Sequence, residues 1–139
     1  NDVYDNLDDD TLIISVNDDE ELTRKSTIRV IENYCIKNNL KVNIIECSDG
    51  IECLYNYYLL NKKGRTFSFV LSDESMILMN GSKCAEILKD ISKDFRIPFF
   101  ILSAYSVDNI TKNSAIDAYF SKPLRTTDIQ SIFDKIKNN

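Results

Sequence analysis

The sequence contains no histidine among its 139 residues. This absence excludes a Ser-His-Asp triad, a histidine general base, a histidine-ligated metal site and a phosphohistidine on this chain. Glycine is also scarce, with three residues, and no Gly-rich loop follows the first apolar run. A dinucleotide-binding or P-loop fold is therefore excluded as well. Any chemistry must be carried by carboxylates, hydroxyls and lysines.

The sequence also lacks an excess of basic residues. Lysine and arginine number 17 against 22 acidic residues, which gives a formal net charge of −5. This balance argues against nucleic acid as a partner, because backbone phosphates need a basic surface. No apolar run approaches the roughly 20 residues of a membrane-spanning helix, so we expect no membrane insertion. Residues 1–10 are acidic and unlike a signal peptide. We interpret them as a leader or a linker remnant before a domain at 11–139.

The four cysteines form no C-x-x-C pair, and without histidine they cannot complete a mixed zinc site. They are Cys35, Cys47, Cys53 and Cys84. Their apolar neighbours favour buried free thiols over a disulfide framework. We therefore expect an intracellular, cytoplasmic protein.

Short apolar runs alternate with longer stretches of helical spacing. The runs predict strands at residues 11–16, 42–45, 67–72, 99–102 and 118–120. The spacing predicts helices at 20–38, 51–60, 84–91, briefly around Val107 and Ile110, and at 129–136. Strands that alternate with helices indicate an α/β fold with helices on both faces of a parallel sheet. We expect a flavodoxin-like, doubly wound sheet of five strands in the order 2-1-3-4-5, with five helices.

Apolar positions within the helices predict which side faces the sheet. In the first helix they are Leu22, Ile28, Ile31 and Cys35, in the second Ile51, Leu54, Tyr58 and Leu59, and in the last Ile129, Ile132, Phe133 and Ile136. The tyrosine-rich stretch 55–58 is interpreted as core and rim packing rather than a ligand site.

Polar residues follow the predicted strands at the edge where open parallel sheets bind ligands. Asp18 and Asp19 follow the first strand, Asp73 the third, Ser103 the fourth and Lys122 the fifth. Three neighbouring carboxylates need a counter-charge, and oxygen ligands without histidine favour Mg²⁺ or Mn²⁺. With such a cation, an ammonium and a hydroxyl could bind a phosphoryl group, and one carboxylate could accept it as an aspartyl phosphate.

The order and register of these residues resemble the receiver domains of two-component response regulators, including those of hybrid histidine kinases. The resemblance covers roughly residues 11–138. Residues 73–81 resemble the family's D-x-x-M-P-x-M-D-G motif, and Asp18-Asp19 its acidic pair. Ser103-Ala104 and Lys122-Pro123 resemble its T/S-A and K-P pairs, and Tyr119 matches its aromatic switch position.

The resemblance implies that Asp73 accepts a phosphoryl group from a phosphohistidine. The donor would be a separate histidine kinase or histidine phosphotransfer domain. Mg²⁺ would be held by Asp18, Asp19 and Asp73 together with the backbone carbonyl of Ser75. Slow self-dephosphorylation, rather than enzymatic turnover, is expected of the isolated domain.

The resemblance also implies a switch. Ser103 and Lys122 would contact the phosphoryl oxygens, and Tyr119 would turn into the space that Ser103 leaves. The altered surface would then select partners, with a phosphorylation-dependent dimer as one form.

Some positions depart from the family pattern. Ile77 stands in place of proline, Asn80 in place of aspartate, and Asn17 in a normally apolar slot. The interval from Ser103 to Lys122 is about one helical turn short, and the deficit falls in the fourth helix.

Two other functions stay open. A Mg²⁺-dependent phosphatase of the haloacid dehalogenase type needs a second aspartate two positions after its nucleophile, where this chain has Ser75. A receiver-like interaction module without phosphoryl turnover is the other, against which Asp73, Ser103 and Lys122 argue. Taken alone, the Asp18-Asp19 pair is also typical of acidic residues at the N-terminus of a helix. Tyr119 taken alone is also typical of a half-buried packing residue in a strand.

Overall fold

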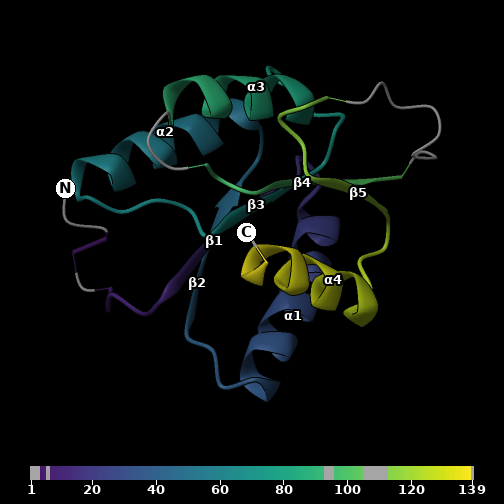
Figure 1. The fold of residues 1–139 in the computed structure, drawn as a ribbon. Coiled ribbons are helices and arrows are strands. Elements are labelled where there is room, and N and C mark those ends of the chain that lie inside the picture. The colour runs from purple at the N-terminus through teal and green to yellow at the C-terminus, as the bar shows by residue number, and fades with distance from the viewer. Residues whose placement is uncertain (1–3, 6, 93–95, 105–112, 139) are drawn as a thin grey trace.

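The structure, a computed structural model, describes residues 4–5, 7–92, 96–104 and 113–138 (Figure 1). Its five parallel strands form one sheet in the order β2-β1-β3-β4-β5, as predicted. The strands are β1 (Leu12–Asn17), β2 (Val42–Cys47), β3 (Phe69–Ser72), β4 (Phe99–Ser103) and β5 (Ala118–Ser121). The helices are α1 (Glu21–Lys37), α2 (Gly50–Lys62), α3 (Gly81–Ile91) and α4 (Thr126–Lys137). The predicted short helix around Val107 and Ile110 lies outside the described residues.

Helices cover the sheet on both sides, with α1 and α4 on one face and α2 and α3 on the other (Figure 1). Successive β1 residues therefore enter opposite cores: Ile13 packs on the α2 and α3 side and Ile14 on the α1 and α4 side. Strands β3 and β4 are buried throughout, which explains their apolar sequences. No helix within the described ranges is both long and apolar enough to cross a membrane.

All four cysteines are buried free thiols, as the sequence predicts. The hydroxyl of Ser15 lies 3.5 Å from the sulfurs of both Cys47 and Cys53. Contact with Cys53, together with burial, raises the pKa of the Cys47 thiol. These thiols are packing groups of the core rather than reactive ones.

The segment interpreted as an acidic leader is packed on the domain in part. Tyr4 is buried, and its hydroxyl donates a hydrogen bond to the Asn56 side chain on α2. Leu7 packs against the same core, and the Arg65 guanidinium donates to the carbonyl oxygens of Leu7 and Asp8 at 3.2 Å. These residues are therefore not a fully solvated tail.

The buried face of α2 is not the predicted one. Its buried residues are Gly50, Cys53, Tyr57 and Leu60. Of the residues predicted to face the sheet, Ile51 and Tyr58 are exposed and Leu54 and Leu59 only partly buried. The helix carries apolar residues at helical spacing on two sides, so periodicity alone selected the wrong one.

Asn17 ends β1 and is buried beneath the carboxyl edge of the sheet. Its side-chain oxygen accepts a hydrogen bond from the Ser15 hydroxyl at 2.7 Å. Its amide nitrogen Nδ2 has no hydrogen-bond partner among the described residues. A buried donor without a partner destabilises the folded state.

We expect the double change Asn17→Leu with Ser15→Ala to raise the free energy of unfolding by about 1 kcal/mol, because it removes the unpartnered Nδ2 together with the hydroxyl that Asn17 accepts from. Urea denaturation of the two proteins measures the difference. Asn56→Leu is the matched control. The Asn56 side chain accepts from Tyr4 and donates to the Glu52 carbonyl, so its loss should destabilise. A lower stability for the double variant would show that Nδ2 does have a partner in solution.

Candidate functional site

Adjacent strands β1 and β3 bring Asp18 and Asp73 to one edge of the sheet. Asn17 pairs with Ser72 in the strand register, so the next residue of each strand leaves the sheet at the same level. The Asp73 amide donates to the Asn17 carbonyl at 2.8 Å, and the Asp18 amide donates to the Cys47 carbonyl at 2.9 Å. The two carboxylates are thus held by backbone hydrogen bonds at the carboxyl end of the sheet.

The start of α3 packs closely against the end of β3. The Gly81 amide donates to the Glu74 carbonyl at 3.0 Å. A Cβ at position 81 would lie 2.5 Å from the Asp73 carbonyl oxygen, so only glycine permits this approach. The Glu74 carboxylate accepts from both the amide and the hydroxyl of Ser82 at 2.8 Å. Glu74 is therefore engaged with the first turn of α3.

Asp18, Asp19 and Asp73 form a carboxylate cluster. Each offers an oxygen, and the three oxygens lie within 4.8 Å of one another. Oxygens on opposite sides of one Mg²⁺ ion are roughly 4 Å apart, so the cluster fits a single hard cation with a small shift. Asp18 is buried, Asp73 partly buried and Asp19 exposed. Asp19 and Ser75 line the same surface hollow, and both are exposed.

Lys122 lies between two of these carboxylates. It follows β5, and its ammonium Nζ lies 2.8 Å from Oδ2 of Asp18 and 3.1 Å from Oδ2 of Asp73. Its backbone amide donates to the Ser103 carbonyl at 2.8 Å. The lysine that follows the last strand thus supplies a positive charge to the carboxylates that follow the first and third.

Burial decides the electrostatics of Asp73. It raises the pKa of the carboxyl, which the Lys122 ammonium opposes and the Asp18 charge reinforces. For Lys122, burial alone would lower the pKa, but its hydrogen bonds to Asp18 and Asp73 raise it. In the absence of a cation, burial therefore destabilises the ionised form of Asp73 relative to its protonated form.

We expect Asp73→Asn to raise the melting temperature at pH 7 by about 2–6 °C when no divalent ion is present. The pKa of Asp73 is higher in the folded chain than in the unfolded one, so wild-type stability falls as the pH rises through this interval. The gain should vanish below about pH 4, where the carboxyl is protonated in both states. Thermal melts from pH 3 to 8 test this. Asp90→Asn, at an exposed position of α3, should show no such profile.

Ser103 and Tyr119 lie on neighbouring strands. Ser103 ends β4 and is buried at the same sheet edge as Asp73. Tyr119 is partly buried in β5 and packs against the core on the α2 and α3 side. Its hydroxyl accepts a hydrogen bond from the Asn113 amide at 3.2 Å. The structure thus describes half-buried packing for Tyr119, and its switch role stays a prediction.

The contacts of Arg24 and the exposure of Leu22 were not predicted from the sequence. The Arg24 guanidinium donates to the Asp18 carbonyl at 2.7 Å and to the Glu46 carboxylate at 2.8 Å, so it braces the loop after β1. Leu22 was expected to face the sheet, yet it is 83% exposed. It lines a surface hollow with Lys122 and Pro123. The sequence did contain a sign that Leu22 is exposed. Leu22 lies six positions before Ile28, which does not fit the spacing of three or four residues along the buried side of a helix.

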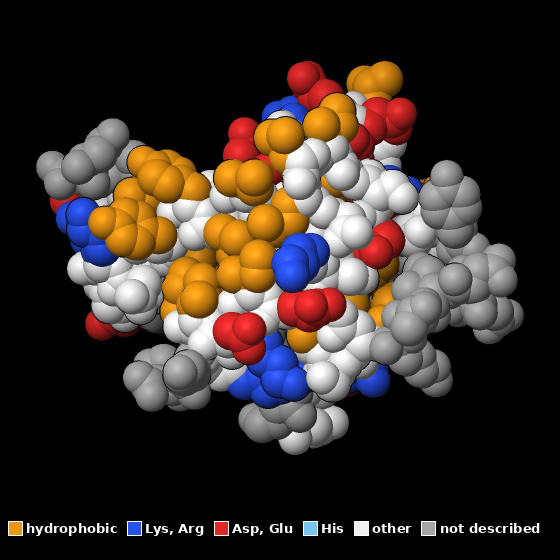
Figure 2. Space-filling view, turned by 90° about the horizontal axis from the view of Figure 1, so that it is seen from above, with side chains coloured by type: hydrophobic (Ala, Val, Ile, Leu, Met, Phe, Trp, Pro, Cys, Tyr) orange, Lys and Arg blue, Asp and Glu red, His pale blue; other side chains and the backbone are white. Residues whose placement is uncertain are grey.

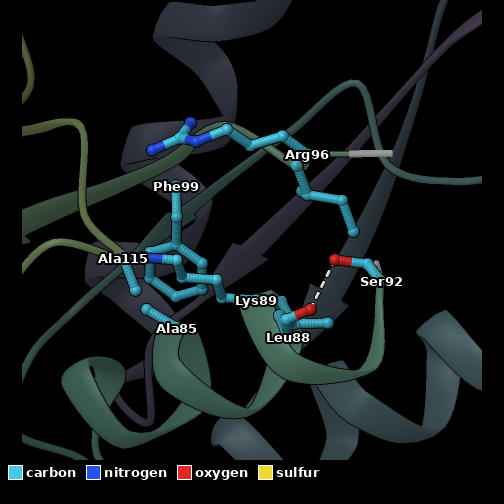
Figure 3. Close-up of a pocket in the computed structure, with 8 residues that line it drawn as sticks. Ala85, Leu88, Lys89, Ser92, Arg96, Phe99 and Ala115 are labelled. Carbon is cyan, nitrogen blue, oxygen red and sulfur yellow. Dashed lines mark hydrogen bonds between the residues drawn. The ribbon is translucent and has the colours of Figure 1, made fainter. Parts of the chain in front are cut away.

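A separate cavity of about 230 Å³ lies beside α3 at the amino end of β4, away from the carboxylate edge (Figure 3). Ala85, Leu88, Phe99 and Ala115 supply apolar walls, and Lys89 and Arg96 are also in its lining (Figure 3). The charges already have partners: Arg96 pairs with Asp117 at 2.7 Å, and Lys89 donates to Ser114 at 3.1 Å. Because the cavity lies at the opposite end of the sheet from the carboxylates, it is no part of the carboxylate site.

No protein-family model and no curated protein sequence matches the chain. Solved structures do match. A two-component response regulator from Cytophaga hutchinsonii has 20% identity and a TM-score of 0.78, over 91% of this chain and 97% of that chain. A CheY-like receiver domain protein from Methanospirillum hungatei JF-1 has 21% identity and a TM-score of 0.70, over 92% and 95%. The receiver domain of a histidine kinase from Arabidopsis thaliana has 17% identity and a TM-score of 0.71, over 92% and 91%.

These comparisons define the fold. The chain has the CheY-like fold of response regulator receiver domains, which confirms at this level the resemblance seen in the sequence.

Proposed function

We propose that this chain is a phosphorelay receiver in which Asp73 accepts a phosphoryl group from a phosphohistidine in a Mg²⁺-dependent reaction. One observation carries the proposal: Asp18, Asp19 and Asp73 converge at the carboxyl edge of a receiver-type sheet, with the Lys122 ammonium against two of them. This is the charge arrangement that binds and transfers a phosphoryl group.

The chemical step needs only groups in and next to this cluster. A carboxylate oxygen of Asp73 forms a bond to phosphorus while the bond from phosphorus to the donor imidazole nitrogen breaks, and its electron pair stays on that nitrogen. Mg²⁺ held by Asp18, Asp19, Asp73 and the Ser75 carbonyl would supply positive charge beside the transferring group. Asp18 is buried and held by the β1 backbone, which fixes its carboxylate before the donor arrives.

After transfer, Lys122 has a new partner. In the unphosphorylated chain its ammonium bridges Asp18 and Asp73. In the phosphorylated chain it would contact a phosphoryl oxygen. The Ser103 hydroxyl would contact another, and the inward movement of Ser103 would let Tyr119 turn. This local charge change would bias the surface between two states and so select partners, including a phosphorylation-dependent dimer. The four free thiols support a reducing, cytoplasmic compartment.

A donor protein suits the site better than a small substrate. Apolar side chains stand on both sides of the carboxylates: Leu22 is 83% exposed on α1, and Ile77 and Leu78 are 71% and 77% exposed in the loop after β3. A partner protein would remove these side chains from water. Ser75, where a haloacid dehalogenase has its acid/base aspartate, offers only a hydroxyl. Measurable turnover of p-nitrophenyl phosphate would support the phosphatase instead.

The experiment that tests the proposal is phosphotransfer from a panel of phosphorylated histidine phosphotransfer domains. With the most active donor, we expect Leu22→Ser to slow transfer by at least about tenfold, because it removes apolar contact area at the interface. Labelling of the same variant by acetyl phosphate should be unchanged, since serine adds no charge beside Lys122.

Ile36→Ser is the matched control, because Ile36 is 72% exposed at the other end of α1. It should transfer at the wild-type rate. Equal rates for both variants would remove Leu22 from the donor interface. If no histidine donor transferred to a chain that acetyl phosphate does label, the relay would be disproved while the acceptor chemistry stood.

A further inference from the structure

Helix α2 presents an apolar stripe to solvent. Ile51, Tyr55 and Tyr58 are 47%, 60% and 55% exposed. They follow one another at intervals of about one helical turn, and Lys62 is next in the same row. The Lys62 ammonium lies 5.3 Å from the centre of the Tyr58 ring. We refer to these four residues as the α2 stripe.

The stripe lies on the face that α2 and α3 turn outward. Seen from above, this face carries a broken band of hydrophobic side chains with charged groups beside it (Figure 2). Cys53, Tyr57 and Leu60 fill the opposite, inner side of α2, so the fold itself does not need the stripe. Two exposed tyrosines so close together are typical of a protein interface.

The stripe is complementary to itself in an antiparallel arrangement. The midpoint of Ile51 and Lys62 along the helix coincides with the midpoint of Tyr55 and Tyr58. When two copies of α2 lie antiparallel about a two-fold axis at this point, Tyr55 of each copy faces Tyr58 of the other. Ile51 of each copy likewise faces the aliphatic stem of Lys62 of the other. A two-fold interface requires such pairing of one surface with itself.

The charges follow the same symmetry. The exposed carboxylate of Glu52 lies in the first turn of α2, and Lys62 lies in the last. Antiparallel packing places Glu52 of one copy beside Lys62 of the other, twice per dimer. The helix dipoles are also opposed in this arrangement, which is favourable. Parallel packing would instead bring like charges together.

We infer that the α2 stripe is the interface of a weak homodimer, with α2 of one copy antiparallel to α2 of a second copy. The exposed parts of the apolar side chains amount to roughly 500–700 Å² over both copies, less than a stable interface buries. The dimer should therefore form reversibly and without phosphorylation. It is a different association from the phosphorylation-dependent one proposed above.

Sedimentation velocity of the unphosphorylated chain, from about 5 to 500 µM, tests this inference. We expect the weight-average mass to rise from 16.0 kDa toward twice that value. Tyr55→Ser with Tyr58→Ser should keep the chain monomeric throughout. The matched control is Ile36→Ser, which removes an apolar side chain exposed on α1 and should associate like the wild type. Circular dichroism verifies that each variant is folded.

Charge reversal tests the antiparallel geometry. Glu52→Lys and Lys62→Glu should each associate about tenfold more weakly, because each places like charges opposite one another. An equimolar mixture of the two variants should recover association, since every contact is then between opposite charges. No single-variant defect in folding can produce that recovery.

A monomeric wild type, or a dimer that both tyrosine substitutions leave intact, would overturn the inference. Failure of the mixture to recover would overturn the antiparallel arrangement. The stripe would then be open to a different protein. Acetyl phosphate labelling of the tyrosine variant should match the wild type, so failure of the dimer and failure of the Asp73 proposal are distinguishable.

Discussion

Asp73→Asn should take up no phosphoryl group from acetyl phosphate and Mg²⁺, whereas the wild type should take up one. An amide oxygen can still accept the Lys122 hydrogen bond, so the variant keeps the geometry of the site but loses the nucleophile. Intact-protein mass spectrometry counts the phosphoryl groups, and hydroxylamine cleavage identifies an acyl phosphate.

Asp18 is the other carboxylate to test as the phosphoryl acceptor, because it contacts the same Lys122 ammonium at 2.8 Å. Its side chain is only 5% exposed, against 11% for Asp73. Asp18→Asn should therefore reduce labelling through loss of the cation, and a higher Mg²⁺ concentration should recover part of it. No Mg²⁺ concentration should recover Asp73→Asn. Equal label on wild type and Asp73→Asn would place the acceptor elsewhere.

Mg²⁺ should stabilise the wild type by about 1–3 kcal/mol at concentrations 10 to 100 times its dissociation constant. The ion replaces repulsion among the carboxylates of Asp18, Asp19 and Asp73 with attraction. Thermal melts with and without the ion measure this gain. Removal of Mg²⁺ with a chelator should also reduce acetyl phosphate labelling by about 100-fold or more.

Asp18→Asn and Asp19→Asn should each lose most of this stabilisation, whereas Asp90→Asn, at an exposed position of α3, should keep it. The outcome for Asp19 is the sharper one, because an exposed carboxylate otherwise contributes little to stability. If Mg²⁺ changed neither the melting temperature nor the labelling, Asp18 and Asp19 would have no metal role.

The helices show where sequence periodicity was sufficient. In α4, Ile129, Ile132 and Phe133 are buried as predicted, because this helix is apolar on one side only. In α2, by contrast, Ile51 and Tyr58 were expected to face the sheet and instead face solvent. A helix with two apolar sides offers two ways to pack, and the sequence does not rank them.

The sequence alone determined the alternation of strands and helices, the parallel sheet and the edge at which Asp18, Asp73 and Lys122 emerge. These follow from local patterns: buried strands are continuously apolar, and parallel strands end at one edge. Only the tertiary structure decided that Lys122 contacts both carboxylates, since 104 residues separate it from Asp18. It alone also left Leu22 and the α2 stripe in solvent. Which apolar side of a helix is buried depends on what the neighbouring elements already fill, and that is a property of the assembled fold.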